Sequence, residues 1–317
     1  MKHSWGFSIS LLIVAMGITI ACIPALQAQM SNSNVSCLKI EVTNGAGCFT
    51  IDNLPTNAGS PVDLFFKTNL TGIQDWTWLC RYPPGQTNLV MSNLPPDQCF
   101  FMLGVTNPIR PGFGQQILDR NDDGSTGEVP IGFVINFLGS SNATLYVNNN
   151  GNVTFGGPLS DYAPDPLNSL GMSIMAPYWA DVDTRNSASG VVQYGTNLVD
   201  GNLAFGVDWV NVGYYAEYAD KLLSCQLVII NRSDIGPGDF DMEFNYFKVQ
   251  WEWGDASIGY PPRAGYSDGT NDYELPGSGV EGAFLDTNAA TGLIYQSLNS
   301  SVPGRYIFFF RDGQRLP

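Results

Sequence analysis

The sequence predicts an all-β protein, and two observations support this prediction. Short apolar or alternating segments recur along the chain, and Gly, Pro, Asn and Asp separate them, which is typical of β-sandwiches. No segment shows the longer apolar period of an amphipathic helix. We therefore expect two β-domains, over residues 29–105 and 119–317, joined by a linker over residues 106–118 that contains several Pro and Gly residues.

The first domain is predicted from six segments with strand character. Turns at Pro83-Pro84 and Pro95-Pro96 punctuate them. The pattern favours a small sandwich of immunoglobulin or fibronectin type, although the Cys and Trp spacing of true immunoglobulin domains is not reproduced. The segments are 37–42, 48–51, 62–67, 76–80, 88–91 and 99–103.

Four cysteines lie in this first domain, at Cys37, Cys48, Cys80 and Cys99. Because an exported chain meets an oxidising compartment, we expect them to form two disulfides, whose pairing the sequence leaves open. A further cysteine, Cys225, lies in an apolar strand-like segment and is predicted to be a buried, inert thiol.

The second domain begins with a clear strand and hairpin pattern. Every odd position from Val129 to Phe137 is apolar, which predicts a strand with one buried face. The segment 149–151, Asn-Asn-Gly, predicts a hairpin turn, because an Asn-Gly pair readily adopts positive φ angles. Alternating faces over 203–209 and 240–246 predict two more strands, and apolar residues on both faces of 305–310 predict a central one.

Residues 1–28 are predicted to be a signal peptide. An apolar run from Ile9 to Ile23 follows Lys2, and the segment ends in a small residue, Ala28. The alternatives are a membrane anchor, for which the run is short, and a lipoprotein signal at Cys22. No later segment is long and apolar enough to cross a bilayer, so we expect a secreted, extracellular protein.

Charge and histidine content disfavour several functions. The formal net charge is −15, which argues against nucleic acid and anionic membranes as partners, because both attract clustered Lys and Arg. The only histidine, His3, lies in the predicted signal peptide. The mature chain would then lack the residue on which Ser-His-Asp triads, histidine proton shuttles and most zinc sites depend.

Eight short motifs follow one another in the order of one known domain. They include Ala176-Pro-Tyr-Trp-Ala-Asp-Val-Asp183 and Trp251-Glu-Trp-Gly-Asp-Ala-Ser257. Over these motifs the chain resembles the nidogen-like (NIDO) extracellular domain. The resemblance implies extracellular matrix, adhesion or surface-layer work by a domain with no established catalytic residues. The motifs lie at 176–185, 209–215, 220–222, 238–246, 251–257, 264–266, 275–279 and 304–306.

One acidic loop matches the beginning of a calcium-binding loop. Asp119, Asn121 and Asp123 alternate and Gly124 follows, which places oxygen ligands and a turn where Ca²⁺ needs them. The twelfth position of such a loop is Pro130 rather than a bidentate Glu. These residues therefore predict either a calcium site or an acidic turn before a strand.

Two carboxylate pairs suggest a hydrolase as an alternative. Asp181 with Asp183, and Asp239 with Asp241, have the spacing that places two side chains on one face of a strand, and glycoside hydrolysis needs paired carboxylates. The alternating pattern makes a solvated strand face the favoured interpretation of the second pair. A turn cap or an ion pair with Arg185 explains Asp181.

Aromatic residues concentrate late in the chain, beginning with Trp251 and Trp253 and continuing to Tyr260, Tyr266 and Tyr273. Aromatic faces beside polar groups can stack on sugar rings, which makes a glycan-binding surface an alternative. Packing in the sandwich core is the favoured interpretation of the two tryptophans, because aromatic side chains bury large surfaces.

Six sequons are candidate glycosylation sites, on the condition that the host glycosylates its secreted proteins. They lie at Asn34, Asn69, Asn142, Asn152, Asn231 and Asn299.

Together these observations predict a non-enzymatic secreted protein that acts through contacts with extracellular proteins or with copies of itself. A soluble module that binds a glycan or a matrix protein is the first alternative. A secreted polysaccharide hydrolase is the second.

Overall fold

The computed structural model describes residues 37–43, 46–52, 62–67, 77–82, 88–91, 100–104 and 106–317. The chain divides into two compact units, Met1–Thr106 and Asn107–Pro317. The described residues form strands and one short 3₁₀ helix, η1 (Leu167–Ser169), so the all-β prediction is confirmed. The predicted signal peptide lies outside the described residues. Within the described ranges, the structure contains no helix with the length and apolar character needed to span a membrane.

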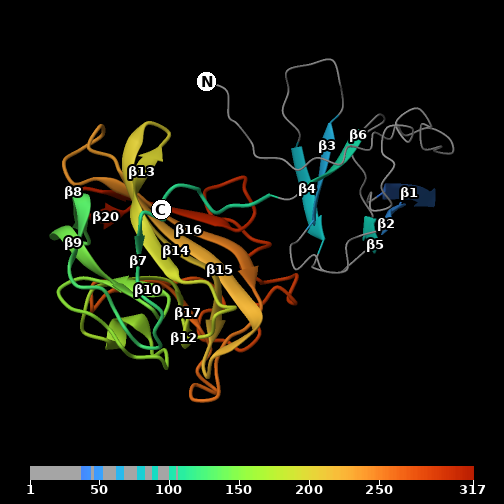
Figure 1. Cartoon of the computed structure of the whole chain (residues 1–317). Coiled ribbons are helices and arrows are strands. Elements are labelled where there is room, and N and C mark those ends of the chain that lie inside the picture. The colour runs from blue at the N-terminus through green and yellow to red at the C-terminus, as the bar shows by residue number, and fades with distance from the viewer. Residues whose placement is uncertain are drawn as a thin grey trace. The chain divides into compact units, whose positions relative to one another are not determined.

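The first unit contains two three-stranded sheets (Figure 1), with the strand orders β1-β2-β5 and β4-β3-β6. Each of the six predicted segments coincides with one strand. The strands are β1 (Cys37–Thr43), β2 (Ala46–Asp52), β3 (Val62–Lys67), β4 (Thr77–Tyr82), β5 (Asn88–Met91) and β6 (Phe100–Gly104).

A buried carboxylate organises one of these sheets. Asp63 in β3 is fully buried and accepts hydrogen bonds from the Arg81 guanidinium at 2.8 and 2.9 Å, from Trp78 Nε1 at 2.9 Å and from the Thr106 amide at 2.8 Å. The last bond ties the end of the unit to its middle strand, β3. A charge this deeply buried requires such a complete set of donors.

The predicted disulfides are not confirmed. Cys80 in β4 is a free thiol, and burial raises its pKa to about 12, which keeps it protonated and unreactive at neutral pH. Cys99 and the side chains of Cys37 and Cys48 lie outside the described residues. The immunoglobulin- or fibronectin-like character of this unit therefore stays a prediction.

The second unit is a sandwich of two antiparallel sheets (Figure 1). The six-stranded sheet has the order β18-β17-β11-β10-β9-β8, and its strands in chain order are β8 (Val129–Phe137), β9 (Ser140–Asn148), β10 (Asn152–Thr154), β11 (Ile174–Trp179), β17 (Arg263–Ser267) and β18 (Asp272–Glu274). The eight-stranded sheet has the order β20-β19-β16-β15-β14-β13-β7, with β12 paired to β14. Its strands are β7 (Gln116–Ile117), β12 (Val182–Asp183), β13 (Val192–Val199), β14 (Asn202–Tyr214), β15 (Tyr218–Asn231), β16 (Phe240–Val249), β19 (Arg305–Arg311) and β20 (Gln314–Arg315).

Alternation places one face of each sheet in a shared core, as the sequence predicted. The apolar positions of 240–246 are fully buried, as are Val207 and Trp209 of β14, whereas Leu203 at the strand's beginning is 37% exposed. Cys225 is fully buried among these residues, and burial raises its pKa well above the ordinary value, which confirms the inert thiol.

The hairpin at 149–151 is also confirmed, and Gly151 is essential to it. This glycine has a φ of 74°, and a Cβ atom there would lie 1.7 Å from the carbonyl oxygen of Tyr178. The turn therefore packs directly on the end of β11, and any side chain at this position would force the two apart.

The segment predicted as a linker packs on the second unit instead. The boundary falls between Thr106 and Asn107, and β7 pairs with β13. Phe113 is fully buried in a cluster with Val228 and Ile230, on the side of the eight-stranded sheet away from the core. The partners of Phe113 begin at Val199, far later in the sequence, so the local Pro and Gly content did not reveal this packing.

The outer face of β16 likewise differs from the prediction of a solvated face. Asp241 and Glu243 are 7% and 2% exposed, and Asn245 is fully buried. The Arg110 guanidinium donates to both oxygens of Glu243 at 2.6 and 2.8 Å, and the Gln226 side chain bonds both the amide and the carbonyl of Arg110. A strap over residues 107–118 thus covers Glu243, whereas Arg232 and Arg311 pair with Asp241.

Candidate functional site

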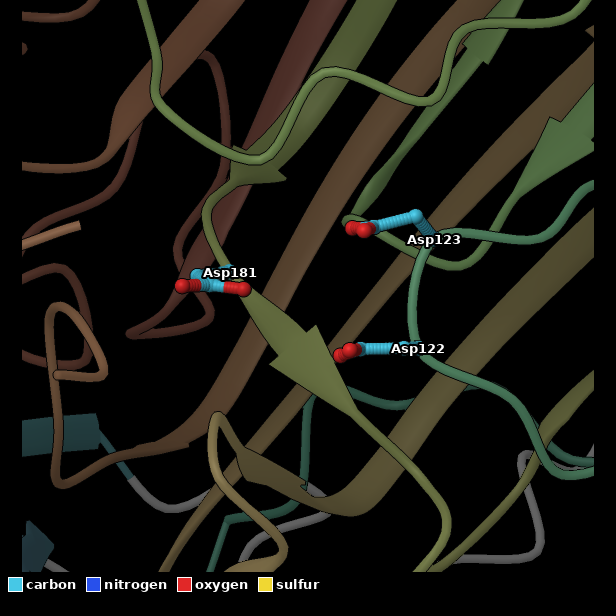
Figure 2. A group of neighbouring side chains, drawn as sticks. All are labelled: Asp122, Asp123 and Asp181. Carbon is cyan, nitrogen blue, oxygen red and sulfur yellow. The ribbon is translucent and has the colours of Figure 1, made fainter. Parts of the chain in front are cut away.

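Three carboxyl groups meet at one end of the sandwich (Figure 2). Asp122 and Asp123 lie in the loop between β7 and β8, and Asp181 lies between β11 and β12. One oxygen from each carboxyl group lies within 4.8 Å of the other two. We refer to these three residues as the acidic cluster.

Two asparagines of the hairpin turn hold the acidic cluster together. Asn149 Nδ2 donates to the backbone carbonyls of Asp122 and Val182, the latter at 2.5 Å. Asn150 Nδ2 donates to Asp123 Oδ1 at 2.8 Å, and Asn150 Oδ1 accepts the Val182 amide at 3.0 Å. Both asparagines are 1% exposed, so a buried polar turn joins the acidic loop to β12.

Each carboxyl group in the acidic cluster has one oxygen engaged by a donor. Asp122 Oδ2 lies 3.0 Å from Arg185 Nη2, Asp123 Oδ1 accepts from Asn150, and Asp181 Oδ2 accepts from Ser257 Oγ at 2.8 Å. Within the described part of the chain, the other oxygen of each group has no hydrogen-bond donor, and Asp122 Oδ1 is buried as well. The unpaired oxygens are the ones available to a ligand.

The electrostatics of the acidic cluster favour a bound cation. Burial, together with the neighbouring carboxylates, raises the pKa of Asp122 to about 6. Burial and the nearby Asp123 and Asp183 raise the pKa of Asp181 to about 6 as well, against a smaller opposing effect of the Ser257 hydrogen bond. At neutral pH these groups are ionised at a cost in free energy that a divalent cation would offset.

Of the three residues predicted to bind calcium, the structure places only Asp123 in this group. Asp119 is exposed, and its carbonyl accepts a 2.6 Å hydrogen bond from Asn121 Nδ2. Asn121 Oδ1 accepts the Gly124 amide at 2.6 Å, so this side chain closes a turn. Asp122 and Asp181 were missed as ligands, because nothing in their local spacing places them side by side.

In each carboxylate pair weighed as a hydrolase site, at least one member forms an ion pair with arginine. Asp183 is fully buried and forms a bidentate pair with Arg185, with distances of 2.6 to 3.1 Å. Burial alone would raise the pKa of Asp183, but hydrogen bonds from Arg185 and from the Glu217 amide hold it below its ordinary value. The expected pair between Asp181 and Arg185 is therefore corrected, since Arg185 pairs with Asp183 and Asp122 instead.

The favoured interpretation of Trp251 as a core residue is confirmed. Trp251 is 3% exposed, and its Nε1 donates to the Val212 carbonyl at 3.2 Å. The same interpretation is corrected for Trp253, which is partly exposed and lies outside the buried core, whereas Tyr266 is buried. Tyr260 of the predicted cluster is 47% exposed and Tyr273 is partly exposed. Tyr218, which lies outside that cluster in the sequence, is 42% exposed.

The sequons differ in exposure. Asn152 is fully buried, its Oδ1 accepts a 2.7 Å hydrogen bond from Asn148 Nδ2, and no glycan fits there in the folded protein. This corrects its inclusion among the candidates. Asn299 is exposed, and Asn142 and Asn231 are partly exposed. Asn34 and Asn69 lie outside the described residues.

The chain is similar to a known protein family and to several known proteins. Residues 109–296 match the family described as NIDO related. Alpha-tectorin from Homo sapiens is 30% identical over 229 residues, which are 62% of this chain and 10% of alpha-tectorin. Nidogen from Drosophila melanogaster is 27% identical over 204 residues, which are 55% of this chain and 14% of nidogen. The match thus spans about a tenth of the first of these relatives, and no solved structure matches the chain.

Proposed function

Because the chain belongs to the NIDO-related family, we propose that it is a non-enzymatic extracellular matrix-type protein that acts through contacts with other extracellular proteins or with copies of itself. The family match over residues 109–296 is the observation that carries this proposal. It agrees with the resemblance of eight motifs to the nidogen-like domain and with the similarity to alpha-tectorin and nidogen.

The arrangement of the carboxylates supports the non-enzymatic part. A glycoside hydrolase needs two carboxyl groups that both face the scissile bond. Asp183 is fully buried and bonded to Arg185, and Asp241 is bonded to Arg232 and Arg311. These acids serve the stability of the fold, which leaves neither pair free to act on a sugar.

Two measurements test the proposal. Light scattering and negative-stain electron microscopy of the secreted protein should reveal a defined oligomer or filament, or a stable complex once extracellular matrix proteins are added. A protein that stays monomeric and binds none of them would contradict it. Hydrolysis of polysaccharides that Asp181→Asn removes would instead establish the enzymatic alternative.

We further propose that the calcium ion expected from the sequence binds at the acidic cluster rather than at Asp119 and Asn121. The observation that favours this placement is the buried, unpaired Oδ1 of Asp122, which faces two other carboxyl groups. Asp122, Asp123 and Asp181 would each supply one carboxylate oxygen, the ligand type that Ca²⁺ prefers.

Export is the remaining part of the proposal. Cleavage after Ala28 would remove residues 1–28 and leave a mature chain without histidine. Amino-terminal sequencing of the secreted protein tests this directly. A chain that retains Met1, or that begins at a lipid-modified Cys22, would contradict it.

A further inference from the structure

Two tyrosines form a cross-strand pair where β14 ends and β15 begins. Tyr214 and Tyr218 are directly opposite each other in the ladder, and their ring centroids are 5.3 Å apart. Tyr218 is 42% exposed, whereas Tyr214 is partly buried against the core. The pair therefore presents an aromatic face to solvent from a sheet rather than from a loose loop.

An aromatic stack holds this pair in place. Tyr214 stacks on Trp251 with centroids 5.3 Å apart, and Trp251 meets the buried Tyr178 edge to face at 5.9 Å. The exposed ring of Tyr218 is thus the outer end of a chain of contacts that begins in the core. A large side chain that is fixed before binding loses little entropy on binding, which is typical of residues that dominate interfaces.

Two carboxylates border the tyrosine pair. Tyr214 Oη donates to Asp220 Oδ1 at 2.9 Å, and Tyr218 Oη donates to Asp255 Oδ2 at 3.3 Å. Burial and Asp220 raise the pKa of Tyr214 to about 12, so its hydroxyl stays protonated. Among the described residues, neither Asp220 nor Asp255 forms an ion pair with a lysine or arginine. No lysine or arginine in the described part of the chain therefore neutralises their charges.

This combination fits a positively charged side chain. A cation is attracted to the face of a tyrosine ring, and a carboxylate at the edge of the ring supplies a charged acceptor for its N–H donors. The whole chain has a net charge of −15, which would draw a basic partner toward this surface. A second copy of the chain carries the same negative charge and fits less well.

We propose that Tyr214, Tyr218, Asp220 and Asp255 form a docking surface for an arginine- or lysine-bearing segment of another extracellular protein. The inference rests on the proposed function, because it specifies the chemistry of the partner. One guanidinium lies over the Tyr218 ring and pairs with Asp255. Arginine is preferred over lysine, because its planar group both stacks and forms two parallel hydrogen bonds.

The test uses a hexa-arginine peptide as the probe and isothermal titration calorimetry of the full chain at physiological salt. Tyr218→Ala should weaken binding by about 3- to 30-fold, the range of one cation–π contact. Tyr218→Phe keeps the ring and should have a smaller effect. Asp255→Asn should weaken binding by a similar factor to Tyr218→Ala.

Matched controls lie at the opposite end of β14. Leu198→Ala removes an exposed apolar side chain, and Asp200→Asn removes a charge in a turn whose φ of 49° suits asparagine. Both should leave hexa-arginine binding unchanged. Equal effects of Asp200→Asn and Asp255→Asn would mean that the peptide senses only net charge, which would overturn the docking surface.

The outcomes separate this inference from the proposed function. If the wild-type protein assembles or binds matrix proteins and Tyr218→Ala does so equally well, the docking surface is wrong and the proposed function stands. If a neutral oligosaccharide such as chitohexaose binds in a Tyr218-dependent way and hexa-arginine does not, the surface recognises a glycan and the inference is overturned.

Discussion

Two groups of carboxylates in the second unit have opposite electrostatic surroundings. Asp241 and Glu243 on the outer face of β16, together with Asp239 directly before the strand, lie within 4.0 Å of arginines. These arginines are Arg110, Arg232, Arg305 and Arg311. In the acidic cluster, Arg185 is the cation that pairs with Asp122, and it is shared with Asp183.

This difference distinguishes the acids that stabilise the fold from those that a ligand would have to neutralise. Burial alone would raise the pKa of Glu243, but Arg110 and Arg305 hold it below its ordinary value, whereas the pKa values of Asp122 and Asp181 are raised to about 6. Compensated acids stabilise the folded state, and uncompensated ones cost stability until a ligand pairs with them. The acids near β16 alternate along one segment, whereas Asp181 lies far from Asp122 and Asp123 in the sequence.

The largest effect should come from breaking the compensated group. Arg110→Leu leaves Glu243 buried without its bidentate partner, which should lower the free energy of unfolding by about 3–5 kcal/mol. Chemical denaturation measures this loss. The exposed Lys221→Leu is the matched control and should change stability by less than about 0.5 kcal/mol.

A double variant tests whether the loss of stability comes from the unpaired charge. Arg110→Leu combined with Glu243→Leu removes both charges and should recover much of the lost stability, because no unpaired charge is left buried. Equal destabilisation by the single and double variants would show that the strap is held by packing of Phe113 rather than by the ion pair.

The next effect concerns the acidic cluster. Calcium at 100 times its Kd should raise the free energy of unfolding by about 2.7 kcal/mol, which corresponds to about 5–10 °C in Tm for a domain of this size. Asp181→Asn should remove most of this shift, and Asp241→Asn should keep it. Differential scanning calorimetry with and without calcium makes the measurement, and an unchanged Tm in the wild type would contradict the site.

The sequence predicted the strands well and the acidic cluster poorly, for a physical reason. Alternation at 240–246 and the Asn-Asn-Gly turn are local signals, and both were confirmed. The acidic cluster depends on Asn149 and Asn150, which join loops that are distant in the chain. Arg110 was assigned to a linker for the same reason, since its partner Glu243 lies 133 residues later.

The pH dependence should follow the raised pKa values. Folding raises the pKa of Asp181 from the ordinary value near 4 to about 6, so the folded protein binds more protons than the unfolded chain between these pH values. Its contribution to stability is therefore present below about pH 4 and is lost as the pH rises to about 6. Without calcium, the free energy of unfolding of the wild type minus that of Asp181→Asn should decrease as the pH rises through this window. Asp208 has a similarly raised pKa, and the subtraction removes its contribution.

Two single substitutions test the contrast between the two groups of carboxylates most directly. The quantity that decides is the sign of the change in the free energy of unfolding at pH 7 without calcium. Asp241→Asn loses charged hydrogen bonds to Arg232 and Arg311 at 2.7 and 2.6 Å and should lower the free energy of unfolding by about 1.5–3 kcal/mol. Asp181→Asn keeps an oxygen that can accept the Ser257 hydrogen bond, removes a repulsive charge and should raise stability by about 1 kcal/mol. In denaturant unfolding, a loss of stability in Asp241→Asn together with a gain in Asp181→Asn would support this contrast. Loss of stability in both variants would show that the acidic cluster is as structural as the acids on β16.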